Sequence, residues 1–107
     1  MTAPVPDLDP VIHAQVRLRV VVVLSALREG DQMAFPRLQE LLGLTGGNLS
    51  VHLRKLEDAE YIVVTKTHHG RTPTTLLRLS RRGRLAFDEY TAALHALLDA
   101  AGSEETP

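Results

Sequence analysis

Cysteine and tryptophan are missing from this chain of 107 residues, and aromatic residues make up only 4% of it. Without cysteine there can be no disulfide, no thiolate ligand for a metal and no cysteine nucleophile, which is typical of a reducing compartment. With so few aromatics the core must be aliphatic, because apolar residues still account for 44% of the sequence. We therefore expect one small cytoplasmic domain with a core of leucine and valine.

Long apolar runs are also missing. The longest, Val20–Leu24, is far too short to cross a bilayer. The first ten residues, MTAPVPDLDP, lack the basic and then apolar pattern of a signal peptide. No Ser–His–Asp constellation, glycine-rich phosphate loop or evident pair of carboxylates can be assembled from the chain. We expect no membrane contact, no cofactor and no enzyme activity.

The charge distribution is uneven, although the formal net charge is only −1. The segment from Thr45 to Arg84 contains eight basic and three acidic residues, a net charge of +5, which leaves −6 for the rest of the chain. A surface that binds phosphate would produce such asymmetry. Ordinary surface charge that happens to cluster would produce it too, so the spacing of the residues has to decide.

The first periodic segment predicts a helix from Pro10 to Arg28 that ends at Gly30. Asp9 followed by proline is a good helix start, since an acceptor side chain precedes a residue suited to the first turn. The stretch VRLRVVVVL alternates like a strand, but its boundaries and length favour a helix. Because this helix is apolar nearly all round, we expect it to be buried on several sides, as in a dimer core. Residues 1–8 are expected to form a flexible arm.

Two short helices joined by a tight turn are predicted next. QMAFPRLQELLGL indicates a short extended piece near Met33, a helix that begins with a proline, and a stop at Gly43. Thr45 can cap the following helix by accepting a backbone N–H. That helix begins at Gly46 or, if both glycines belong to the turn, at Asn48. Two short helices joined in this way define a helix-turn-helix.

The remaining residues predict a hairpin and a long last helix. YIVVTKTHH and TTLLRLS are typical of two strands, joined here by the longer loop GRTP. Ser80 can cap a helix from Arg81 to about Ala100, and residues 102–107 are expected to be a disordered tail. The predicted fold is mainly α with a small β-hairpin, a winged helix-turn-helix over residues 9–101. Its order is helix, short strand, two helices, two strands, helix.

The last helix carries an apolar seam at steps of three and four residues: Phe87, Tyr90, Leu94, Leu97 and Ala101. No other predicted element is large enough to cover this seam. We therefore expect a homodimer through the first and last helices. The alternative is that the last helix packs entirely back onto the first.

The third helix has a face suited to reading DNA. Its leucines fall on one arc that must face the core, which turns the polar residues to the opposite side. There Arg54 could bond guanine, Asn48 could pair with adenine and Val51 could touch a thymine methyl. Ser50, His52 and Lys55 are better suited to phosphates. Gly47 would let backbone N–H groups approach a phosphate closely. The predicted DNA-binding residues are Thr45, Gly47, Asn48, Ser50, Val51, His52, Arg54, Lys55, Lys66 and Arg71. A solvated polar helix face is the alternative.

The hairpin tip is the second predicted contact. Lys66 and Arg71 crowd toward it together with two histidines. Arg71 is the best candidate for a minor-groove contact, since narrow A·T grooves attract arginine. A polar loop tip with no function would have the same composition.

These features together resemble the winged helix-turn-helix regulators of the MarR-like and ArsR-like type. The resemblance is carried by DPVIHAQVRLRVVVVL, FPRLQELLGLTGGNLSVHLRKLEDAEYIVV and GRTPTTLLRLSRRGRLAF, nearly the whole chain between Asp9 and Ala101. It implies a homodimer on a palindromic operator in double-stranded DNA, with the third helix in the major groove and the hairpin at the minor groove. Members often have an acidic or polar residue where Gly46 stands. They often have glycine where Glu60 ends the third helix, so that turn is expected to be strained or different.

Two other functions fit the same fold. One is a module for protein–protein contact with no operator, and salt-insensitive or absent binding to duplex DNA would favour it. The other is a sensor for a metal or small molecule. His95 and Asp99 lie four residues apart on the last helix, as two ligands from one helix face would, and His68 and His69 are adjacent. Without cysteine, a dedicated metal site has few ligands to draw on.

Overall fold

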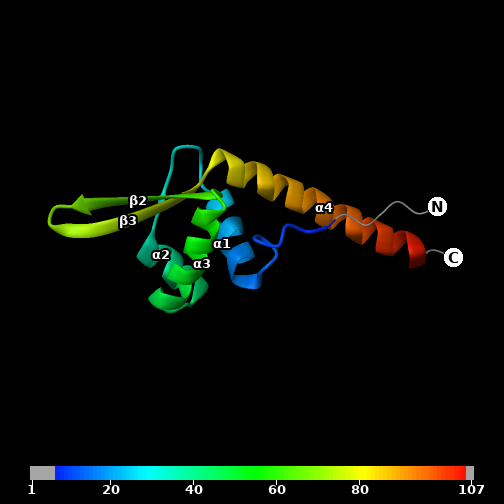
Figure 1. The fold of residues 1–107 in the computed structure, drawn as a ribbon, viewed down its shortest axis with the longest axis horizontal. Helices are drawn as coiled ribbons and strands as arrows, with labels where there is room; N and C mark the ends of the chain where they lie inside the picture. The colour runs from blue at the N-terminus through cyan, green and yellow to red at the C-terminus, as the bar shows by residue number, and fades with distance from the viewer. Residues whose placement is uncertain (1–6, 106–107) are drawn as a thin grey trace.

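A helical body carries a hairpin on one side and a long helix on the other (Figure 1). The computed structural model describes residues 7–105, with principal extents of 64 × 25 × 22 Å. The helices α1 (Gln15–Ser25), α2 (Phe35–Leu42) and α3 (Gly46–Asp58) form the body. Strands β2 (Ile62–His69) and β3 (Thr72–Leu79) form the hairpin, and α4 (Arg81–Glu105) projects away from it. The predicted order of elements is confirmed, and no helix within residues 7–105 has the length and apolarity that a membrane span needs.

The sheet is antiparallel in the order β1-β3-β2, where β1 (Met33–Ala34) is the short extended piece expected from the sequence. Met33 pairs with Leu77, and the hairpin runs in register out to the pair His69 and Thr72. The connection is therefore a two-residue turn, and the predicted longer loop GRTP is wrong. Gly70 supplies the left-handed backbone (φ 64°) that the first position of such a tight turn requires.

The core is aliphatic and α1 lies at its centre. Its buried members come from α1, α2, α3 and the hairpin: Val20, Val21, Leu24, Leu38, Leu42, Leu49, Leu53, Leu56, Ile62, Leu77 and Leu79. Burial of a valine or leucine contributes about 1.5–3 kcal/mol, which exceeds the few tenths by which valine disfavours a helix. The valine-rich segment is therefore helical, as predicted. Part of its apolar surface is covered within one chain, but Val22 is 47% exposed, so the placement of α1 in a dimer core stays a prediction.

The start of α1 lies five residues later than predicted. Asp9 does cap a turn, because its Oδ1 accepts the backbone N–H groups of Val11 (2.8 Å) and Ile12 (3.4 Å). The turn does not continue as a helix, since Ala14 is extended (φ −125°, ψ 131°). Ile12 is fully buried there in a second apolar cluster with Tyr90 of α4. Asp9 thus starts a turn as its local sequence predicts, but the packing of Ile12 on Tyr90 ends that turn before it becomes a helix.

The connection from α2 to α3 follows the predicted signals. Gly43 is left-handed (φ 65°), and its N–H donates to the carbonyl of Gln39 at 2.9 Å, which closes α2. Thr45 Oγ1 accepts the N–H of Asn48 at 3.1 Å, as expected for a cap. The helix begins at Gly46, so both glycines belong to α3 rather than to the turn.

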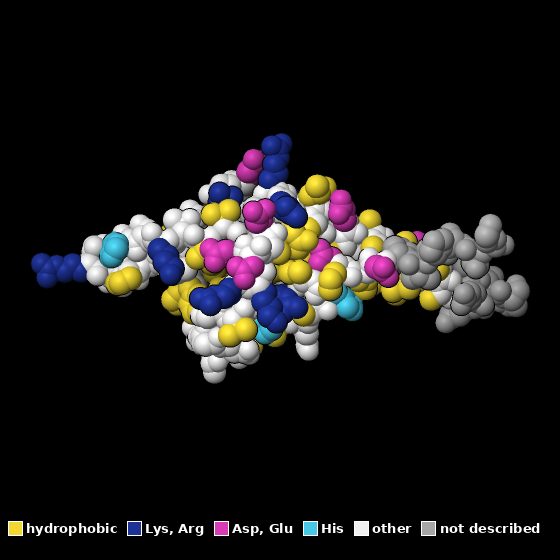
Figure 2. Space-filling model, viewed as in Figure 1, with side chains coloured by type: hydrophobic (Ala, Val, Ile, Leu, Met, Phe, Trp, Pro, Cys, Tyr) yellow, Lys and Arg dark blue, Asp and Glu magenta, His cyan; other side chains and the backbone are white. Residues whose placement is uncertain are grey.

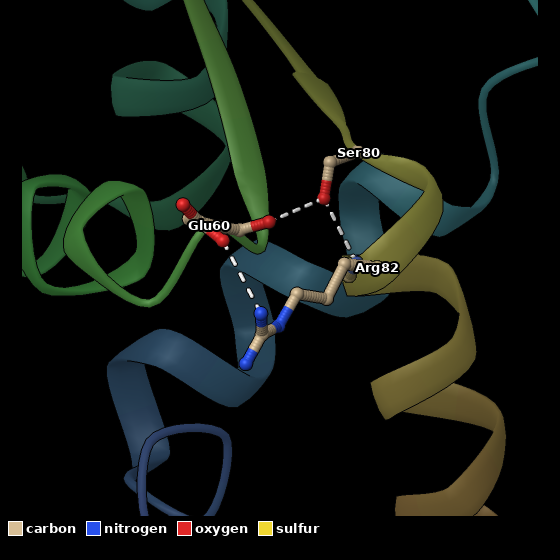
Figure 3. A network of polar contacts seen from close by, with 4 residues as sticks. Glu60, Ser80 and Arg82 are labelled. Carbon is tan, nitrogen blue, oxygen red and sulfur yellow. Dashed lines mark hydrogen bonds and ion pairs between the residues drawn. The ribbon is translucent and has the colours of Figure 1, made fainter.

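The end of α3 is held in a left-handed turn without glycine. Glu60 has φ 64°, and the N–H of Tyr61 reaches back to the carbonyl of Leu56 at 2.9 Å, as in a Schellman cap. Ser80 Oγ donates to the carbonyl of Glu60 at 2.6 Å, and Arg82 pairs with the carboxylate at 3.2 Å (Figure 3). The expected departure from glycine is confirmed, and contacts from the start of α4 hold the strained residue.

The start of α4 touches the same backbone. Ser80 Oγ accepts the N–H of Gly83 at 2.9 Å, which caps the helix as predicted. Gly83 packs so closely on the chain that a Cβ there would lie 1.9 Å from the carbonyl oxygen of Tyr61. Glycine is thus required for this crossing.

The far end of α4 is longer than predicted. The helix continues to Glu105, so the end near Ala100 and the disorder expected for residues 102–105 are wrong. One glycine costs a helix only about 1 kcal/mol, and no proline occurs between Pro73 and Pro107. Residues 106 and 107 of the predicted tail and residues 1–6 of the predicted arm lie outside the described residues.

Candidate nucleic-acid interface

The α3 helix separates its apolar and polar residues onto two faces. Leu49, Leu53 and Leu56 are buried in the core, as the spacing predicted. On the opposite face Val51 is 57% exposed. The remaining predicted contacts of α3 and its cap are exposed as well, except His52, which is half-buried: Thr45, Gly47, Asn48, Ser50, Arg54 and Lys55. This face offers amide, hydroxyl, methyl and guanidinium groups in the combination that base edges and phosphates bind.

Nothing in the packing of the chain requires glycine at the two positions that begin α3. A Cβ at Gly47 would meet nothing within 4 Å, and one at Gly46 would make ordinary contacts at 3.8 Å with Gln39 and Phe35. Neither glycine has a positive φ. Since glycine disfavours a helix relative to alanine, these residues lower stability without relieving any clash. The exposed backbone they leave is the notable property of this helix start.

His52 is tied to α1 by a contact that sequence reasoning missed. Arg17 Nη1 lies 3.3 Å from His52 Nδ1, and Arg17 Nε donates to the carbonyl of Val11 at 2.6 Å. Burial, and then the positive charges of Arg17 and Lys55, lower the pKa of His52 from its ordinary value. The two partners are 35 residues apart, so no local spacing indicates this pair. The structure therefore adds Arg17 to the flank of α3.

The hairpin carries Lys66 and Arg71 away from α3. Lys66 pairs with Thr75 in the ladder and is exposed, while Arg71 is exposed in the two-residue turn at the tip. Because successive strand residues rise about 3.3 Å each, the four pairs from Lys66 outward place Arg71 more than about 10 Å farther along the hairpin. The structure thus yields two groups of predicted contacts, one on α3 and one on the hairpin (Figure 1).

The basic segment of the sequence does not form one surface. Arg82 is paired with Glu60, and Arg84 donates to the carbonyl of Ser25 at 3.3 Å. Arg78, Arg81 and Arg84 line a cavity of about 840 Å³ between the end of α1 and the start of α4, together with three carboxylates: Glu29, Asp31 and Asp88. The idea that the net charge of +5 marks a single phosphate footprint is therefore wrong. Four of its eight basic residues belong to the junction with α4.

The exposed face of α3 has a gradient of charge. Figure 2 shows basic side chains and a histidine gathered over α1 and α3, with acidic side chains beside them toward α4. In sequence order Arg54 and Lys55 are followed by Glu57 and Asp58, all exposed. Basic and acidic residues therefore share the end of the helix, and a polyanion can approach it only on the side of Arg54 and Lys55.

The histidines considered as metal ligands do not assemble. His68 and His69 are consecutive residues of β2 and therefore point to opposite faces of the hairpin. His95 and Asp99 lie on the exposed surface of α4. Within the part of the chain that the structure describes, no group of three or more His, Asp or Glu side chains could hold a metal ion together.

The comparisons with known proteins agree with this arrangement. A sequence profile described as a winged helix DNA-binding domain matches residues 16–98, and that description names DNA binding rather than an enzyme activity. An uncharacterized protein of Methanocaldococcus jannaschii is 31% identical over 80 residues, which cover 75% of this chain and 84% of that protein.

Solved structures share the fold. A transcriptional regulator homologue from Pyrococcus horikoshii is 27% identical with a TM-score of 0.77, and the match covers 85% of this chain and 87% of the other. The transcriptional repressor CouR, solved on a 23-mer DNA duplex, is 20% identical with a TM-score of 0.71, over 89% of this chain and 64% of its own. The resemblance seen in the sequence is thereby confirmed: the chain belongs to the family of winged helix DNA-binding domains.

Proposed function

We propose that this protein is a transcriptional regulator that binds double-stranded DNA sequence-specifically, with α3 in the major groove. The observation that carries the proposal is the exposed face of α3. Asn48, Val51 and Arg54 lie on this face, while the leucines of the helix are buried on the opposite face. An α-helix about 10–12 Å across fits a major groove about 12 Å wide. Arg54 would read guanine, Asn48 adenine and Val51 a thymine methyl. CouR, which has the same fold, was solved on a DNA duplex.

The glycines at the start of α3 support the same placement. Glycine at position 47 lowers the helix's stability without any intrachain cause. A phosphate at this helix start would provide the cause, because backbone N–H groups and the helix dipole both favour an anion there. Ser50, His52, Lys55 and the cap Thr45 would hold the sugar–phosphate backbone on either side.

The hairpin would act as the wing. Arg71 at its tip is placed to enter a minor groove beside the major groove that α3 occupies, and Lys66 nearer the body would contact phosphate. The exposed, narrow hairpin that extends from the body supports this role (Figure 1).

Dimerisation through α4 completes the proposal. A helix of 25 residues is about 37 Å long. Of the apolar seam predicted to face a partner, Phe87, Tyr90 and Leu94 pack within the chain instead. Beyond Leu94, Leu98 is 58% exposed, and earlier in the helix Leu85 is 59% exposed. A second copy of the chain would cover these leucines and place two reading helices about 34–36 Å apart on a palindromic operator.

The experiment that tests the function is selection of bound duplexes from a random library by the wild-type chain and by the variants R54A and R71A. Wild type should enrich one palindromic motif. R54A should lose preference at defined bases, since a bidentate arginine–guanine pair contributes about 1–3 kcal/mol of discrimination. R71A should bind more weakly or lose only an A·T preference. Selection of the same motif with unchanged strength by both variants would overturn the assignment of readers.

Sedimentation of the wild type and of the double variant L85E/L98E tests the dimer. Wild type should sediment as a dimer and the variant as a monomer with an intact thermal transition. A wild-type monomer at high concentration would contradict this part of the proposal without touching the role of α3.

A further inference from the structure

One flank of α3 is built by a guanidinium from α1. Arg17 Nε donates to the carbonyl of Val11 at 2.6 Å, Nη2 makes a longer contact of 3.5 Å with the carbonyl of Pro10, and Nη1 lies 3.3 Å from His52 Nδ1. An arginine has five N–H donors, so one on each terminal nitrogen is left for another acceptor. The side chain is fixed in place before any ligand arrives.

The contact also sets the state of His52. Arginine can only donate, so Nδ1 of His52 is the acceptor and the ring is neutral, with its proton on Nε2. Burial and the charges of Arg17 and Lys55 lower the pKa of His52, which keeps the ring neutral. Asp58 of the same helix lines a hollow that Arg17 and Lys55 border. The cluster therefore offers N–H donors from a guanidinium, an ammonium and an imidazole.

Within residues 7–105 neither Arg17 nor Lys55 forms an ion pair with a carboxylate. The ion pairs found within residues 7–105 are Arg37 with Glu40 and Arg82 with Glu60. Arg17 and Lys55 instead border a hollow of about 390 Å³, lined by Pro10, Val11, Arg17, Lys55, Asp58 and Ala59. Arg17 and Lys55 carry two positive charges beside this hollow against the single carboxylate of Asp58. An anion that enters the hollow would be stabilised by this excess of positive charge.

The placement of this hollow selects the anion. A helix that lies in the major groove nearly fills its width, so each flank of the helix faces a sugar–phosphate backbone. In the proposed complex the flank with Ser50 would face one strand. The flank with His52 and Lys55 would face the other, and α1 adds Arg17 there.

We propose that Arg17, His52 and Lys55 form a binding site for a backbone phosphodiester of the DNA strand that lies along the α1 side of α3. The site rests on the proposed function, because it presupposes that α3 enters a major groove. Its contribution is independent of sequence, since a phosphate contact positions the protein without reading a base. Arg17 would thereby fix the depth and rotation of α3 in the groove.

The test is the salt dependence of duplex binding by the wild type, R17Q and the control R28Q. R28Q removes the same charge three residues beyond the end of α1, where Arg28 is exposed and borders the other cavity. Loss of one phosphate contact lowers the slope of log K against log salt by about 0.9. The proposed dimer has two copies of the site, so R17Q removes two such contacts, and wild type should lose about 12-fold more affinity than R17Q between about 50 and about 200 mM salt. R28Q should keep the wild-type slope, and unrelated duplexes should show the same difference.

Two further variants separate charge from structure. R17K keeps the positive charge and should keep the wild-type salt slope. Its affinity should fall, because one ammonium group cannot make the several hydrogen bonds that the planar guanidinium of Arg17 makes. D58N removes the carboxylate that faces the hollow and should bind duplex more tightly than wild type. If R17Q does not fold, D58N decides the question. The NMR-detected pKa of His52 should rise when duplex is added, since a phosphate favours the charged ring.

The outcomes that overturn the site differ from those that overturn the function. A wild type that binds duplex with a steep salt slope, together with an R17Q of equal slope and affinity, would remove the phosphate site and leave the function in place. R17K as low in slope as R17Q would show a purely structural role for Arg17. Unchanged affinity in D58N would also count against the site. Absence of duplex binding by wild type would overturn the function and the site together.

Discussion

The two ends of α3 handle backbone freedom in opposite ways. At its start stand two glycines with ordinary φ angles and room for a Cβ. At its end the backbone requires the left-handed conformation that glycine adopts freely, yet Glu60 stands there with φ 64°. The chain thus has glycine where the fold does not need it and lacks glycine where the fold does.

The surroundings of the two ends explain the difference. At the start, Thr45 caps the helix through the N–H of Asn48, and Gly47 is exposed with nothing within 4 Å of the place a Cβ would take. The end is enclosed by Ser80, Arg82 and Gly83, which hold Glu60 and Tyr61 from the start of α4. A residue that lowers stability without an internal reason indicates an external partner, whereas a strained residue held by many contacts indicates a structural joint.

The substitution G83A should have the largest effect on this comparison. Its Cβ would lie 1.9 Å from the carbonyl oxygen of Tyr61, so α4 or the end of α3 must shift. We expect the free energy of unfolding to fall by more than about 3 kcal/mol in a denaturant titration. G102A is the control in the same helix, because a Cβ at Gly102 would meet nothing within 4 Å. Equal stability of the two variants would show that the crossing is looser than the structure places it.

The substitution G47A should separate stability from function at the open end. Alanine favours the helix by up to about 1 kcal/mol, so the melting temperature should rise. The added methyl keeps a phosphate from the backbone N–H groups, and loss of one hydrogen bond to a charged group should weaken duplex binding about 10-fold or more. G46A is the control, since its Cβ faces Gln39 and Phe35 of α2. A G47A protein that binds duplex as well as wild type would contradict the proposed reason for this glycine.

The substitution E60G should relieve the closed end. Glycine adopts φ 64° without strain, and we expect a gain of about 0.5–1 kcal/mol in the free energy of unfolding. The ion pair with Arg82 is lost, but its side chains are 65% and 75% exposed, and R82A alone should change stability by less than about 1 kcal/mol. Chemical denaturation of the three proteins checks both values. Destabilisation by E60G larger than that of R82A would show that the carboxylate has a second role.

The smallest expected effect is the pH dependence that His52 contributes to stability. Its pKa in the folded protein is lowered, so the unfolded chain binds a proton first as the pH falls through 6.5. Stability from this residue is therefore present above that pH and lost below it. H52Q should lose less stability than wild type between about pH 7.5 and about pH 5 in thermal melts. The same should hold in part for R17Q, because Arg17 contributes to the lowered pKa; a larger loss in H52Q would reverse the sign.

Local signals in the sequence predicted most of the reading unit. Gly43, Thr45 and the leucine spacing of α3 act over four residues or fewer, so the helix ends and the exposed face followed from them. The turn at Glu60 was also predictable, because left-handed caps depend on one position. The ends of α2 and α3 depend on residues within or next to each helix, so the structure shows them where the sequence predicts them.

Contacts between distant residues could not be predicted in the same way. Asp9 signals a helix start correctly, but burial of Ile12 against α4 delays α1 to Gln15. Arg17 meets His52 across 35 positions, and the clustered arginines after β3 turn to a cavity away from the face of α3. Counting charges along the chain groups residues that folding separates, so the candidate site could be outlined from α3 but not completed.

The crossing at Gly83 makes α4 and α3 one mechanical piece. Gly83 in the first turn of α4 packs directly on the carbonyl of Tyr61, which follows α3, and no side chain separates the two backbones. In the proposed dimer, a change in the tilt of α4 at the subunit contact would therefore change the orientation of α3 as well. Whatever alters that tilt alters the distance between the two grooves that the protein can span.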